Sequence, residues 1–255
     1  MTTRKSARNK RELGGAKPAT KEKFNIERDL QPVVAKTAKQ KEYLRYLNDP
    51  NVKAIIVLGL HGTGKTYCAA ATAADFYRKN QIEQIIVSRA YVQTGKSSGL
   101  KPGTALEKLY PYVRNVLDTI KSRIGVGAYE VALKDGCNGA IEVQEVESIR
   151  GRSFDKRSWL MIDEAQQTTP DEMQSIVTRV SDDCKLILMG DVLQKDIRGE
   201  SGLEWFMSFA KRHHLEGVAI INFDDPEEIV RGGLVKDIAV GLAKDRARTK
   251  HKGNE

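Results

Sequence analysis

The chain has 255 residues, of which 40% are hydrophobic and 30% are charged, so it can bury the core of one large or two small domains. No apolar run approaches the roughly 18 residues that a membrane span needs, and no apolar segment follows the basic N-terminus, so we expect neither a membrane span nor a signal peptide. Three widely spaced cysteines argue against a disulfide framework and favour a reducing cytoplasm.

The net charge of +8 suggests a polyanionic partner, with nucleic acid as the first candidate. Residues 1–23 hold eight basic and two acidic side chains, and residues 244–255 hold five basic and two acidic ones, which gives net charges of +6 and +3. The folded part, residues 24–243, therefore carries a net charge of −1. Residues 1–23 have almost no large apolar side chain, so we expect a disordered basic tail. Such a tail either solubilises the protein or binds phosphate backbones.

Continuous apolar runs with β-branched residues are typical of strands that are buried on both faces of a parallel sheet. Such runs predict strands over residues 54–58, 85–87, 141–143, 159–162, 185–189 and 218–221. Helices are expected late in 25–48, after a linker, and over about 65–78, 104–123, 170–180 and 201–212. Thr169-Pro170 and the Ser201/Glu204 pair have the residue types of helix N-termini. The alternation indicates a single α/β domain with a mostly parallel central sheet and helices on both faces.

Residues 59–66, Gly-Leu-His-Gly-Thr-Gly-Lys-Thr, match the phosphate-binding pattern G-x-x-x-x-G-K-[ST] directly after the first strand and at the start of a helix. The glycines let backbone N–H groups curl around phosphate oxygens, and the helix N-terminus adds its positive dipole end. We expect Lys65 to reach the β- and γ-phosphates and Thr66 to offer a hydroxyl to Mg²⁺. His61 is expected to be a spacer. The expected nucleotide-binding residues are Gly59, Gly62, Thr63, Gly64, Lys65 and Thr66.

The apolar strand over residues 159–162 ends in two adjacent carboxylates, which is the Walker B pattern. Asp163 is expected to hold Mg²⁺, and Glu164 to polarise the attacking water as general base. The second carboxylate favours hydrolysis over phosphoryl transfer to a small substrate, because many small-molecule P-loop kinases lack it. A third strand tip carries Gly190-Asp191 and then Gln194, which we expect to sense a γ-phosphate or a water molecule.

In this combination and order, the motifs resemble those of the PhoH family of P-loop ATPases, which is similar to the first motor domain of superfamily 1 helicases. The resemblance runs from Gln40, at a position like the Q motif, to the segment 225–231. It implies a three-layer, RecA-like P-loop fold that binds ATP with Mg²⁺, uses Gln40 in nucleotide binding, and hydrolyses ATP. It also implies handling or unwinding of single-stranded RNA or DNA by a homo-oligomeric ring such as a hexamer. Other matching pieces are Arg89, 99–103 and 150–153.

The chain departs from the family pattern in one place, where Leu60-His61 replaces the usual Pro-Ala. With no appended RNA-binding or nuclease domain expected, it looks like a minimal, phage-type form in a host cytoplasm. Only the family name implies a link to phosphate starvation. Residues 89–103 combine Arg89, Tyr91, lysines and glycines, which suits either contact with a nucleic acid strand or a solvated loop without function.

Superfamily 1 helicases close the ATP site with a second motor domain, for which 255 residues leave no room. We therefore expect an arginine finger from a neighbouring subunit, with Arg150, Arg152, Arg198 and Arg231 as candidates. Arg152 and Arg231 are favoured on their motifs, and the alternative is that each arginine pairs with a surface carboxylate. Three functions compete: a nucleic-acid-dependent ATPase, a small-molecule kinase, and an ATP-binding switch or scaffold for RNA processing with little turnover.

Overall fold

The centre of the molecule is a single parallel β-sheet. The computed structural model describes residues 31–91, 104–133, 139–154, 156–234, 236–242 and 245. In these residues the strand order is β3-β2-β4-β5-β1-β6, and every neighbouring pair is parallel. The strands are β1 (Ala54–Gly59), β2 (Gln84–Arg89), β3 (Ile141–Val143), β4 (Ser158–Asp163), β5 (Cys184–Gly190) and β6 (Val218–Phe223).

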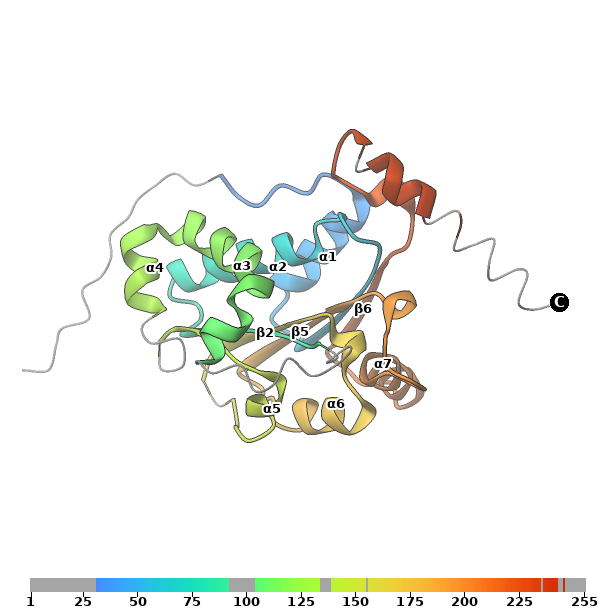
Figure 1. Ribbon diagram of the computed structural model, residues 1–255. Coiled ribbons are helices and arrows are strands. Elements are labelled where there is room, and N and C mark those ends of the chain that lie inside the picture. The colour runs from blue at the N-terminus through green and yellow to red at the C-terminus, as the bar shows by residue number, and fades with distance from the viewer. Residues whose placement is uncertain are drawn as a thin grey trace, which may run out of the picture.

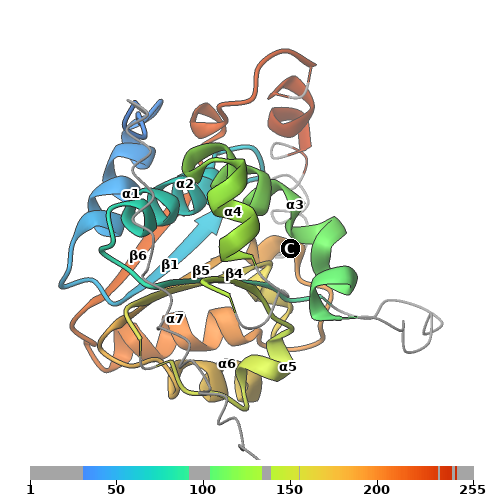
Figure 2. The same cartoon turned by 90° about the vertical axis from the view of Figure 1, so that its left-hand side faces the viewer.

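Helices cover both faces of the sheet and make three layers (Figure 1). One face carries α1 (Ala38–Asn48), α2 (Lys65–Arg78), α3 (Ala105–Ile124) and α4 (Val126–Ala132). The other carries α5 (Val146–Ile149), α6 (Pro170–Val177) and α7 (Gly202–Arg212). Figure 2 shows the sheet between these two groups. Short 3₁₀ turns, η1 (Ala165–Gln167), η2 (Val192–Gln194) and η3 (Pro226–Glu228), follow β4, β5 and β6.

The core lies on both faces because successive strand residues point to opposite sides. In β1, Ile55 and Val57 pack under α1 to α4, whereas Ile56 and Leu58 pack against the layer of α6 and α7. This two-sided burial explains the uninterrupted apolar runs, and it confirms the predicted α/β fold. Cys68 and Cys184 belong to this core as free thiols, and burial raises the pKa of each to about 11.

The predicted helix starts are confirmed. Thr169 and Ser201 each form a capping box with the glutamate three residues later in the chain, and Pro170 is the first residue of α6. Helix α6 ends at Val177, short of the expected 180, because Val180 leaves the helix to form a parallel bridge with Phe154.

The predicted terminal tails, residues 1–23 and (apart from residue 245) 244–255, lie outside the described residues, as do 92–103 of the loop expected to touch nucleic acid. Across the described part of the chain, no helix is both long enough and apolar enough to cross a membrane.

Candidate nucleotide-binding site

The segment 59–66 joins β1 to α2 as a tight loop that requires glycine at particular positions. Gly59 has φ +118°, and a Cβ there would collide with the backbone carbonyl of Phe223 on the neighbouring strand β6. Gly64 has φ +82°, and its Cβ would lie 2.7 Å from the side-chain nitrogen of Gln40. The loop therefore passes close to β6 on one side and α1 on the other. A glycine loop of this kind at a helix N-terminus offers backbone N–H groups to phosphate oxygens.

Lys65 begins α2, and its side chain turns back into the loop. Its ammonium donates to the carbonyl oxygens of Gly59 and Leu60, each at 2.7 Å. Burial lowers the pKa of Lys65 to about 8, although the carboxylates of Asp191 and the Asp163–Glu164 pair act in the opposite direction. A third, longer bond runs to the hydroxyl of Thr63 at 3.5 Å. A buried ammonium that is hydrogen-bonded only to neutral oxygens gains most when a phosphate group takes their place.

Gln40 links α1 to this loop. It is 3% exposed, its amide nitrogen donates to the carbonyl of Thr63 at 2.8 Å, and its amide oxygen accepts from the backbone N–H of Lys36 at 2.8 Å. The residue expected from its Q-motif-like position thus lies at the nucleotide loop, where it supports the backbone of Thr63. Both polar ends of its amide are used, so the side chain is held in one orientation.

The two Walker B carboxylates lie at the carboxyl end of β4. Asp163 accepts from the backbone N–H of Glu164 at 3.1 Å, and burial is the main cause that raises the pKa of Asp163, with Arg89 opposing it. Glu164 has φ +53°, a left-handed conformation that is uncommon for a residue with a side chain. This strain turns the chain sharply into η1, so that two consecutive carboxylates both face the nucleotide loop.

Arg89 lies at the end of β2 and in the wall of the nucleotide cavity. From the sequence we had assigned it to a loop that could contact nucleic acid. The register of β2 and β4 places it opposite Asp163. One guanidinium nitrogen lies 3.0 Å from Glu164 Oε1, and the other lies 3.6 Å from Asp163 Oδ2 and donates to the carbonyl of Tyr112 in α3 at 3.3 Å. Its position at the end of a buried strand indicated a residue near the nucleotide site. Its pairing with both carboxylates depends on the strand order, which places β2 beside β4.

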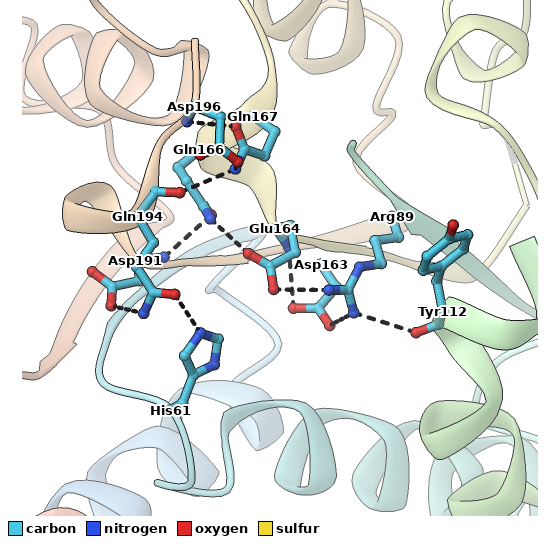
Figure 3. Close-up of polar contacts among 10 residues, drawn as sticks. All are labelled: His61, Arg89, Tyr112, Asp163, Glu164, Gln166, Gln167, Asp191, Gln194 and Asp196. Atoms are coloured by element: carbon cyan, nitrogen blue, oxygen red, sulfur yellow. Dashed lines mark hydrogen bonds and ion pairs between the residues drawn. The ribbon is translucent and has the colours of Figure 1, made fainter. Parts of the chain in front are cut away.

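Amide side chains join the tips of β4 and β5 (Figure 3). The fully buried Gln166 donates to Glu164 Oε2 at 2.6 Å and accepts from the backbone N–H of Asp191 at 3.2 Å. Gln194 donates to Asp191 Oδ2 at 2.6 Å, and its amide oxygen lies 2.8 Å from Nε2 of His61 in the nucleotide loop. His61 therefore does more than space the loop, because it connects the loop to the strand tip that carries Gln194.

The candidate arginines occupy different surroundings. Arg231 lies in the wall of the same cavity as its own nucleotide loop, where its side chain would be 3.3 Å from a Cβ on Gly62. The arrangement brings Arg231 to the site within one chain, whereas the sequence led us to expect it from a neighbouring subunit.

The other favoured arginine, Arg152, lies away from the cavity. It forms an ion pair with Glu142 of β3, whose side chain is 3% exposed, and it also bonds the amide oxygen of Gln84. Arg150 is 3.9 Å from Glu172, and Arg198 is exposed. Arg152 and Arg150 thus each pair with a carboxylate of the same chain, which was the alternative to the role of an arginine finger.

These elements enclose one cavity of about 780 Å³. It lies between the nucleotide loop, the tips of β4 and β5, the start of α1, and the C-terminal part of α3. The predicted residues that line it are Gln40, Gly59, Gly62, Thr63, Gly64, Lys65, Thr66, Asp163, Glu164 and Arg231.

Mg²⁺ fits the donors in this cavity. Thr66 offers a hydroxyl and Asp163 a carboxylate, which are hard oxygen ligands of the kind that Mg²⁺ takes. Among the described residues no cluster of three or more His, Cys, Asp or Glu could hold a metal by itself. Thr66 and Asp163 would be sufficient protein ligands for Mg²⁺, which usually keeps several waters and binds through substrate phosphates.

Several known proteins are similar to this chain. The family model described as PhoH-like protein matches residues 32–242. A PhoH-like protein of Bacillus subtilis (strain 168) is 33% identical over 205 residues, which cover 80% of this chain and 61% of that protein. Protein PhoH of Escherichia coli (strain K12) is 32% identical over 209 residues, which cover 81% of this chain and 57% of that one. The chain thus spans about three fifths of the length of these curated relatives.

A solved structure, the large terminase of a thermophilic bacteriophage in complex with ADP, is similar in fold with a TM-score of 0.50. The similarity covers 79% of this chain and 48% of the terminase, at 14% sequence identity. At that identity the likeness concerns the fold alone, which is the P-loop fold predicted from the motifs. The family model covers most of the chain and is supported by relatives above 30% identity, so the chain belongs to the PhoH family.

Proposed function

We propose that the protein binds ATP with Mg²⁺ and hydrolyses it to ADP and phosphate. The observation that carries the proposal is the meeting of the glycine loop, with Lys65 and Thr66, and the adjacent carboxylates of Asp163 and Glu164 in one cavity. A small-molecule kinase is disfavoured because a second carboxylate beside the first one serves to activate water rather than an alcohol of a substrate.

Each residue then has a defined task. Lys65 leaves its two loop carbonyls for the β- and γ-phosphates, and Thr66 and Asp163 hold Mg²⁺. The oxygen of a water molecule attacks the γ-phosphorus while the bond to the β–γ bridging oxygen breaks. Glu164 takes the proton of that water, and Gln194 orients the water or the γ-phosphate.

The test compares phosphate release and nucleotide binding in wild type, Glu164→Gln and Lys65→Ala. We expect Glu164→Gln to lose at least about a hundredfold in turnover, the usual share of a general base, and to keep its affinity for ATP. Lys65→Ala should lose ATP affinity itself. Undiminished hydrolysis by Glu164→Gln, or undiminished binding by Lys65→Ala, would refute the assignment.

A second function has an observation in its favour, namely the ion pair between Arg89 and Glu164 at 3.0 Å. Arg89 and Gln166 together engage both carboxylate oxygens of Glu164, so the protein in this arrangement suits an ATP-binding switch or scaffold with little turnover. Tight binding of ATP without phosphate release, in the presence and absence of nucleic acid, would favour the switch over the hydrolase.

We further propose that the ATPase depends on single-stranded RNA or DNA and that it works as a homo-oligomeric ring. The net charge of +8 supports the first part, and membership of the PhoH family, whose motifs led us to expect a ring, supports the second. Stimulation of phosphate release by single strands, and the mass of the assembly with and without ATP, test the two parts separately.

Mixing subunits decides how Arg231 acts. The mixture combines Arg231→Ala with Lys65→Ala, each of which is expected to be inactive alone. If Arg231 acts on its own chain's site, as its place in the cavity suggests, the mixture stays inactive. Restored hydrolysis would show that Arg231 acts across a subunit interface.

A further inference from the structure

We propose that the exposed, stacked pair Tyr91 and Tyr112 holds an unpaired base of a single nucleic acid strand. Arg89, which is paired with Glu164, then transmits the effect of base binding to that carboxylate. The inference rests on the proposed nucleic-acid-dependent ATPase, and it says where the strand touches the protein and how it is sensed.

The two tyrosines form a platform from separate elements. Tyr91 follows β2, and Tyr112 belongs to α3. Their rings are nearly parallel, at 10°, with centroids 6.3 Å apart, yet the residues are 45% and 49% exposed. Large aromatic rings that are aligned and left open to solvent offer a planar apolar surface to a third ring. Stacking on an aromatic side chain changes the affinity for a base by roughly 5- to 150-fold and tolerates any sequence.

The charges around the pair point to a base rather than to the phosphate backbone as its occupant. Glu145 and Glu147 lie near Tyr91, and Glu145 is paired with Lys108 at 3.5 Å. Carboxylates repel phosphates, so a strand should contact this place through its bases and keep its backbone away from the carboxylates.

Arg89 connects this platform to the nucleotide site by direct contacts (Figure 3). Its guanidinium carbon lies 6.0 Å from the centre of the Tyr112 ring, and the same group donates to the Tyr112 carbonyl at 3.3 Å. The guanidinium also holds Glu164 at 3.0 Å. A movement of Tyr112 therefore changes two contacts of Arg89 at once, while the remaining partners of Arg89 are Asp163 and Glu164, the proposed general base.

This arrangement explains why nucleic acid should stimulate hydrolysis. While Arg89 donates to Oε1 of Glu164 and Gln166 donates to Oε2, both carboxylate oxygens are engaged and a water molecule has to compete for them. A base stacked on the tyrosines shifts Tyr112, and with it Arg89, away from Glu164. The carboxylate is then free to act. Arg89 is a positioning residue in this scheme, because it works through Glu164.

The experiment uses the full chain and fluorescein-labelled oligo(dT) and oligo(U), with binding measured by anisotropy and ATPase by phosphate release. We expect Tyr112→Ala to weaken oligonucleotide binding by about 5- to 150-fold. It should also lose the stimulation of phosphate release by the oligonucleotide. Tyr112→Phe keeps the ring and should behave like wild type. Tyr110→Ala is the matched control, because Tyr110 is 41% exposed on the same helix.

The coupling step has its own variant. Arg89→Met should still bind the oligonucleotide, but its turnover should be the same with and without it. Persistent stimulation of Arg89→Met would overturn the coupling. Equal binding by Tyr112→Ala and Tyr110→Ala, or loss of binding in Tyr112→Phe, would overturn the stacking site. If wild type neither binds oligonucleotides nor responds to them, the nucleic-acid part of the proposed function fails instead.

Discussion

Replacing Gln166 with Met removes one buried amide and leaves the length of the side chain unchanged. Gln166 is fully buried, donates to Glu164 at 2.6 Å and accepts from the backbone of Asp191 at 3.2 Å. The variant therefore breaks the link between the tips of β4 and β5 without opening a large cavity. The change in the free energy of unfolding then reports mainly the two lost hydrogen bonds.

The magnitude follows from the two bonds. A hydrogen bond to a charged acceptor contributes about 1.5–3 kcal/mol, and withdrawing the acceptor from a buried N–H costs about 1–3 kcal/mol. Glu164 keeps Arg89 as a partner, and its side chain is 18% exposed, so it recovers part of the loss from that ion pair and from water. We expect the free energy of unfolding to fall by about 2–4 kcal/mol.

Urea unfolding monitored by tryptophan fluorescence measures this loss. A cycle with Glu164→Ala separates the two bonds, because Gln166→Met should cost about 1–2 kcal/mol less when Glu164 is already absent. The variant should also lower kcat by about tenfold or more with little change in KM, since the proposed base is no longer held. A destabilisation under about 0.5 kcal/mol, or full additivity in the cycle, would refute this account of the link.

Four further predictions concern the stability of the fold. Arg152→Met leaves the buried carboxylate of Glu142 without its cation and should lower the free energy of unfolding by about 2–4 kcal/mol, while titration with a fluorescent ATP analogue shows unchanged affinity. Burial lowers the pKa of Lys185 to about 8 from its usual 10.5. At pH values between these two, Lys185 is therefore protonated in the unfolded chain and largely neutral in the folded one. Stability should therefore rise with pH through this window, by up to about 1.4 kcal/mol per pH unit. In Lys185→Met, urea unfolding at several pH values should show that this contribution is absent. Gly127 has open space at its Cβ and lies within α4, so Gly127→Ala should stabilise by about 0.5–1 kcal/mol. In Gly59→Ala the added methyl group collides with the backbone of β6, so the free energy of unfolding should fall by more than about 3 kcal/mol. Urea unfolding measures both glycine variants.

Local sequence determined the elements and the chemistry that their ends carry. The run 54–58 became β1 because apolar β-branched residues suit a strand buried on both faces, and the Gly-Lys-Thr turn that follows was recognisable from its own residue types. The caps at Thr169 and Ser201 are equally local, since each bonds a backbone group three residues away. Asp163 and Glu164 were recognisable because they follow directly on such a strand.

Contacts between elements could not be obtained in this way, because they depend on strand order and register. Arg89 faces Asp163 only since β2 and β4 are neighbours, although 74 positions separate the two residues in the sequence. For the same reason Arg152 is held by Glu142, and Arg231 returns to its own nucleotide loop after β6.

The sequence by itself thus determined that this chain is a P-loop protein, because the loop and the strand tips are local patterns with local causes. Only the tertiary structure decided which side chains control the proposed base. Arg89, Gln166 and Tyr112 come together because parallel strands bring their carboxyl ends to one edge of the sheet, where α3 crosses them. Distances in space of about 3 Å between residues far apart in sequence follow from packing, which no single segment encodes.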